Sequence, residues 1–191
     1  MDLHKFGVKF FAADAQSLDI LKLIPVYHRW IQQNALEDLL IDVADYSHVP
    51  AGPGVMLIAY EGNYALDETG HERGVLYYSK QKLAGDLPER LARVAAKALK
   101  AAQLMSADAE LGGALNVPGN RLHFFANDRL AAPNTDTAYG EIEPALKTFL
   151  DRLYGGARYT LTRETDPKER LSVRVQAEGE VSLNTLLARL V

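Results

Sequence analysis

The chain of 191 residues contains no cysteine. This absence excludes disulfide bonds, thiolate metal ligands and a thiol nucleophile. It also fits a reducing compartment, so we expect a cytoplasmic protein. A domain of this length can bury a core large enough to be stable without a crosslink or a structural metal.

The sequence has no excess of positive charge. It carries 21 Lys and Arg residues against 25 Asp and Glu residues, a formal net charge of −4. A chain with this balance has no overall field that attracts nucleic acid, and we expect no nucleic-acid partner. No segment approaches the roughly 20 apolar residues of a membrane span. The start, MDLHKFGVKFF, lacks the pattern of a signal peptide, so we expect no membrane association.

Sequence motifs of known chemistry are also missing. The chain has no GxSxG, HExxH, GxGxxG or GxxxxGK[ST] pattern, and its 5 histidines show no metal-ligand spacing. We therefore predict neither a metal site nor a cofactor.

The hydrophobic and charged fractions, 48% and 24%, are typical of a folded domain. Strand-like segments are rich in aromatic and β-branched residues and are separated by turn residues. The segment 55–68 turns at Glu61-Gly62-Asn63, which favours a hairpin. We predict strands over 5–12, 36–46, 55–68, 73–81 and 121–127, and a C-terminal hairpin that pairs 157–165 with 170–178.

The strongest helix signal lies in 86–108. Asp86 and Glu89 have the spacing of a capping box, Pro88 falls in the first turn, and apolar residues recur every three or four positions from Leu87 to Met105. Further helices are predicted over 25–33, 141–156 and 182–190, with an irregular connection over 128–140.

These elements predict an α+β fold, a mainly antiparallel sheet with helices packed on one face and a C-terminal β-hairpin plus short helix. Runs of strands without strict alternation with helices favour this over a doubly wound sheet. We expect one domain over 1–191, with 157–191 as a possible appendage. An exposed sheet edge or this tail could support a homodimer.

The first candidate site is Asp45 with His48, at the end of a predicted strand. A carboxylate beside an imidazole can orient it for acid–base catalysis. The two side chains could equally satisfy backbone groups of the corner. The next segment, PAGPG (50–54), offers Gly52 and Gly54 either for a rigid turn or for amides that cradle an anion.

Two further segments are candidates for ligand binding. His28 and Arg29 lie in YHRW (27–30), where donors stand beside aromatic surface. A polar cluster follows an apolar strand in FFANDRLAAPNTDT (124–137), and long loops on rigid scaffolds often carry function. Its candidate residues are Asn127, Asp128, Arg129 and Asn134.

Two functions follow from these candidates. The first is a non-catalytic protein that binds a small molecule or a partner, in a cleft formed by the 44–54 corner and the 127–134 loop, with His28 and Arg29 as further candidates. The second is a cofactor-independent enzyme in which His48 is the acid or base, Asp45 orients it, and Arg129 or Arg29 holds a small anionic substrate. The absence of a complete catalytic motif favours the first.

Overall fold

A computed structural model describes residues 1–13, 18–49 and 52–190 of the chain. In this part of the chain, eight strands form one sheet in the order β2-β3-β4-β5-β1-β6-β8-β7. The strands are β1 (Phe6–Phe11), β2 (Leu40–Tyr46), β3 (Gly54–Ala59), β4 (Gly62–Asp67), β5 (Gly74–Ser79), β6 (Arg121–Ala126), β7 (Tyr159–Arg163) and β8 (Ser172–Ala177).

Every neighbouring pair of strands in this sheet is antiparallel. The N-terminal strand β1 lies in the middle, between β5 and β6. The C-terminal hairpin continues the same sheet, because β8 pairs with β6 over five residues. The predicted α+β architecture is confirmed, including the C-terminal strand pair and short helix.

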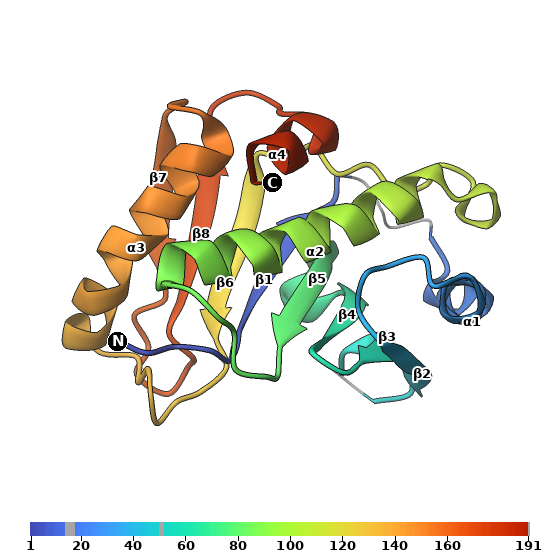
Figure 1. Ribbon diagram of the computed structural model, residues 1–191, viewed down its shortest axis with the longest axis horizontal. Coiled ribbons are helices and arrows are strands. Elements are labelled where there is room, and N and C mark those ends of the chain that lie inside the picture. Colours follow the sequence, from blue (N-terminus) through green and yellow to red (C-terminus); the bar gives the residue numbers. More distant parts are fainter. Residues whose placement is uncertain (14–17, 50–51, 191) are drawn as a thin grey trace.

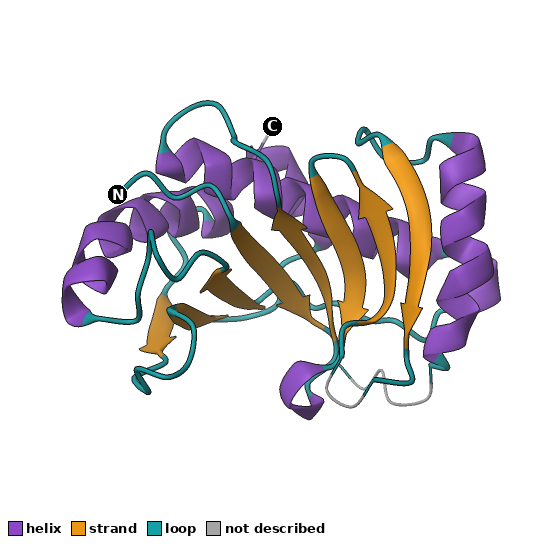
Figure 2. Ribbon diagram, turned by 90° about the horizontal axis from the view of Figure 1, so that it is seen from below, coloured by secondary structure: helices purple, strands orange, loops and turns teal. Residues whose placement is uncertain are grey.

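The long helices lie on one side of the curved sheet, where α2 crosses the central strands (Figures 1 and 2). At the edge of the sheet formed by β2, α1 packs against β2 and β3. The helical segments are η2 (Ile20–Lys22), α1 (Leu23–Gln33), η3 (Thr69–His71), α2 (Leu87–Ala107), η4 (Ala109–Leu111), α3 (Asp136–Tyr154) and α4 (Leu183–Leu190). No helix in the described part of the chain is long and apolar enough to cross a membrane.

The capping box predicted for α2 is present. The Asp86 carboxylate accepts the Glu89 amide at 3.0 Å, and the Glu89 carboxylate accepts the Asp86 amide at 3.1 Å. The predicted apolar stripe is buried from Leu87 to Met105. Together these residues fix α2 across the sheet, because one face of the helix is apolar and its first turn is capped.

Helix α3 begins at Asp136, five residues before the predicted start at 141. The Thr135 hydroxyl caps the helix by accepting the Ala138 amide at 3.2 Å. The sequence prediction missed this turn because Thr135, Asp136 and Gly140 are residue types common in loops. In the structure Ala138 is buried in the core, and its burial stabilises the turn.

The two faces of the sheet follow from the period of two along each strand. In β1, Phe6, Val8 and Phe10 belong to the core that the helices cover. Lys9 and Phe11 therefore point to the opposite face, where no long helix lies. We call this the open face of the sheet.

Candidate functional site

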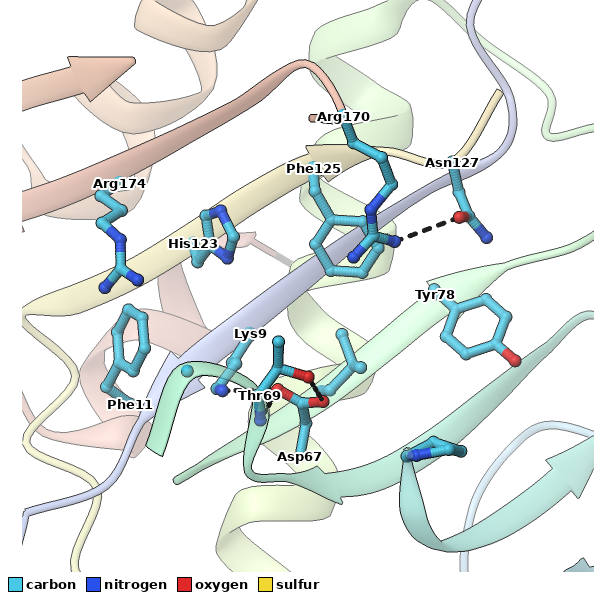
Figure 3. A pocket seen from close by; sticks show the side chains of 13 residues that line it. Lys9, Phe11, Asp67, Thr69, Tyr78, His123, Phe125, Asn127, Arg170 and Arg174 are labelled. Atoms are coloured by element: carbon cyan, nitrogen blue, oxygen red, sulfur yellow. Dashed lines mark hydrogen bonds and ion pairs between the residues drawn. The ribbon is translucent and has the colours of Figure 1, made fainter. Parts of the chain in front are cut away.

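The open face contains a cavity of about 350 Å³ over the central strands. The residues that line it come from β1, β4, β5, β6 and β8, from the segments that follow β4 and β6, and from those that precede β3 and β8 (Figure 3). The strand register explains the convergence, since Lys9 is paired with His123 and His123 with Arg174. Side chains at paired positions share a face and lie close together.

Lys9 is buried at the base of this cavity. Its Nζ lies 2.5 Å from Asp67 Oδ2 and also donates to the Glu72 carbonyl oxygen. The Thr69 hydroxyl donates to Asp67 Oδ1 at 2.8 Å, so both carboxylate oxygens are bound. Burial lowers the pKa of Lys9, and the Asp67 carboxylate opposes this shift.

Arg170, just before β8, differs from the other cations of the cavity. Its guanidinium lies 4.4 Å from the centre of the Phe125 ring, which itself lies over Gly7. It donates to Asn127 Oδ1 at 3.2 Å and forms no ion pair with any described residue. Burial lowers the pKa of Arg170. The charges of Asp67 and Glu169 also act on Arg170, but neither carboxylate forms an ion pair with it. Arg170 therefore offers an anion a partly desolvated charge outside any ion pair with a described residue.

His123 lies between Arg170 and Arg174 on the open face (Figure 3). Burial lowers its pKa to about 4, helped by the charges of Arg174, Lys9 and Arg170 and opposed by Asp67. The imidazole is consequently neutral near pH 7 and can both donate and accept a hydrogen bond.

Glu72 forms ion pairs with Arg121 and Arg174. It accepts from Arg121 at 2.6 Å and also from Arg174. Burial opposes its ionisation, but the hydrogen bonds from Arg174 and Arg121 outweigh it and lower the pKa of Glu72. Both guanidinium groups also lie near the Phe11 ring, at 4.7 and 5.4 Å from its centre.

The cavity continues along the open face toward β7. A second hollow of about 240 Å³ shares Thr69, His123, Phe125, Arg170 and Arg174 with the first and is extended by Thr162, Arg163, Glu164, Glu169 and Ser172. The two hollows form one groove, so a ligand larger than a single anion could occupy both.

Of the residues predicted from the sequence, Asn127 lines this cavity. Asp128 accepts the amides of Leu130 and Ala131 and so caps a turn. Arg129 is exposed and donates to the Lys168 carbonyl oxygen at 2.7 Å. Asn134 is buried and donates to the Asp166 carbonyl oxygen at 2.8 Å, which ties its loop to the β7–β8 hairpin.

The Asp45–His48 pair is not formed in the structure. Asp45 accepts the Ser47 amide at 2.8 Å, and the side chain and then the amide of Ser47, more than the nearby His48, lower the pKa of Asp45. His48 is exposed, and no ion pair joins these two described residues. The arrangement is that of a turn, because the short Asp side chain bonds the backbone two residues on.

In the predicted glycine segment, Pro50 and Ala51 lie outside the described residues. The Gly52 amide donates to the Val49 carbonyl oxygen at 2.9 Å, and Gly54 adopts a φ of 68° at the start of β3. The Gly52 amide is therefore already bound by a backbone carbonyl oxygen. Pro53, between the two glycines, reaches the rim of the open-face cavity.

His28 and Arg29 lie on α1, away from the open-face cavity. His28 is exposed. Arg29 forms ion pairs with Asp108 and with Glu110, the latter at 2.5 Å, and so joins α1 to the end of α2. Arg29 is thus engaged within the protein.

Sequence reasoning missed the residues at the centre of the cluster: Lys9, Asp67, His123, Arg170 and Arg174. One signal was available, since Lys9 and His123 each interrupt an apolar strand at a position that the period of two assigns to the face opposite the core. Arg174 alternates with Val173 and Val175 in β8 and gave the same signal. Arg170 gave none, because it ends the charged segment RETDPKER (163–170), which is typical of solvated surface.

No protein-family model matches this chain, and no curated protein sequence is significantly similar to it. Within the described residues, no group of three His, Asp or Glu side chains is placed to hold a metal ion.

Proposed function

We propose that this protein is a non-catalytic binding protein for a small anionic molecule, such as a phosphate or carboxylate, held in the open-face cavity. The observation that carries the proposal is Arg170, a half-buried guanidinium with no ion-pair partner among the described residues, stacked on Phe125 at the cavity rim. Such a group binds oxyanions through two parallel hydrogen bonds.

The surroundings of Arg170 support the same ligand class. Asn127 holds the guanidinium in place, and His123 offers a neutral donor beside it. Lys9 and Arg174 add positive potential, although each already has a carboxylate partner. An anion would therefore contact Arg170 first and gain from the field of the other two.

The test is a thermal-shift screen with inorganic phosphate, sulfate and small di- and tricarboxylates, followed by calorimetric titration of any anion that raises the Tm. We expect Arg170→Gln to abolish the shift. Arg158→Gln is the matched control, because it removes one positive charge from an exposed residue outside the cavity. An equal shift in wild type and Arg170→Gln would contradict the proposal.

A further inference from the structure

A second cavity lies on the opposite side of the sheet. It has a volume of about 870 Å³ and is bounded by α2, the segments 35–37 and 82–84, and the buried rings of Tyr64 and Tyr77. This volume is within the range of small-molecule sites. The cavity shares no lining residue with the open-face cavity.

The walls of this cavity are largely apolar. Leu36, Leu83, Val94 and Leu187 contribute aliphatic surface from four separate segments. Val94 and Leu36 are buried, and Leu83 and Leu187 are half-buried. An apolar ligand body placed here would remove the exposed parts of Leu83 and Leu187 from water, at about 25 cal/mol per Å².

The rim carries positive charge that the protein does not neutralise. Arg93, Lys97 and Lys100 recur at helical spacing along one face of α2, and Lys82 lies opposite them. Lys97 pairs with Asp38 and, at 2.6 Å, with Glu61. Lys82, Arg93 and Lys100 form no ion pair with any described residue.

Acidic groups also face this cavity. Glu61 is engaged by Lys97, whereas the exposed Glu37 has no ion-pair partner among the described residues. The three unpaired cations outnumber this one unpaired acid, in a chain whose formal net charge is −4. The cavity is thus a locally positive site on an acidic protein.

A polar atom at the floor is also unsatisfied. Tyr77 is fully buried, and its Oη has no hydrogen-bond partner among the described residues, while Lys97 lies 5.4 Å from its ring centre. Buried hydroxyl groups normally have a partner. Burial, and then the carboxylates of Asp38 and Glu61, raise the pKa of Tyr77. The hydroxyl is enclosed by protein, so a ligand in this cavity does not contact it.

We propose that this cavity is a second binding site, for an amphipathic organic anion with an apolar body and a single carboxylate or sulfonate group. The apolar body packs against Leu36, Leu83 and Val94. The anionic group lies at the rim between Arg93, Lys100 and Lys82. Inorganic phosphate lacks the apolar body and does not bind here tightly.

The test uses the fluorescent probe 1-anilinonaphthalene-8-sulfonate, with dodecanoate and dodecanol as competitors on the full chain. We expect dodecanoate to displace the probe and dodecanol to compete at least fivefold less well. The double variant Arg93→Gln/Lys100→Gln weakens dodecanoate binding by about fivefold, since each rim charge contributes a fraction of a factor of ten. Ala96→Glu, which adds a carboxylate between these two cations, weakens it similarly.

The matched control is Arg158→Gln/Lys168→Gln, which removes two exposed charges near the β7–β8 hairpin and should leave the affinity unchanged. Circular dichroism checks that each variant folds. Equal affinities in the wild type and both rim variants, or equal competition by acid and alcohol, would overturn the proposal. Loss of binding in Arg170→Gln would instead assign the probe to the open face and also overturn it.

Discussion

Lys9 Nζ and Asp67 Oδ2 lie 2.5 Å apart although their strands, β1 and β4, are not neighbours. Strand β5 runs between them, and the lysine crosses it at Gly74. A Cβ at position 74 would lie 2.9 Å from Lys9 Cε and 2.5 Å from the Phe10 carbonyl oxygen. The ion pair at the base of the open-face cavity therefore depends on the missing side chain of Gly74.

Replacement of Lys9 by methionine should destabilise the protein by about 3 kcal/mol, because it leaves the Asp67 carboxylate buried without its cation. The measurement is urea denaturation at pH 7. The double variant Lys9→Met/Asp67→Leu should recover most of this loss, since no buried charge remains. A single variant as stable as the wild type would show that Asp67 does not need its partner.

Gly74→Ala should destabilise the protein by about 2 kcal/mol, because the added methyl group meets backbone as well as Lys9. Gly140→Ala is the contrasting substitution. It lies within α3 with no atom near the added Cβ, so it should stabilise by about 0.5–1 kcal/mol. Thermal unfolding of both variants checks the two signs, and two shifts of the same sign would contradict this account of Gly74.

His123 should make the protein less stable at acid pH. Its folded-state pKa, about 4, lies below the ordinary value of 6.5, so only the unfolded chain binds the proton between these values. Stability is thus complete above pH 6.5 and falls by about 3 kcal/mol as the pH drops to 4. His123→Gln should flatten this part of the profile in urea denaturation, whereas His48→Gln, an exposed control, should not.

The anion proposed for the open face should raise the pKa of His123, because it offsets the cations that lower it. Titration of the His123 imidazole by NMR, with and without saturating anion, measures this directly. An unchanged pKa would place the anion away from the cluster.

Tyr64 and Tyr77 are buried and their rings are in contact. Loss of the hydroxyl group should change the stability of the protein differently at the two positions. Tyr64 Oη donates to Asp38 Oδ2 at 2.6 Å, whereas Tyr77 Oη has no partner among the described residues. Tyr64→Phe should therefore cost about 1–3 kcal/mol by leaving a carboxylate oxygen unsatisfied, while Tyr77→Phe is neutral or stabilising. Chemical denaturation compares the two, and an equal loss in both would contradict the assignment.

Local features of the sequence were sufficient for the architecture. The capping box of Asp86 and Glu89 and the apolar stripe behind it specify α2 without reference to the rest of the chain. The start of α3 was not predictable in this way, because burial of Ala138 depends on contacts with distant residues. The sequence of the 44–54 corner did not distinguish a turn from a binding site. Asp45 has the same sequence context whether it bonds Ser47 or a ligand.

The sequence by itself determined the strands, the long amphipathic helix and the face of β1 to which Lys9 points, because these follow from hydrophobic spacing over a few residues. Only the tertiary structure decided that Lys9, Asp67, His123 and Arg170 meet. Their convergence depends on the strand order β4-β5-β1-β6-β8, which is set by packing between segments far apart in the chain. No short-range pattern encodes that order.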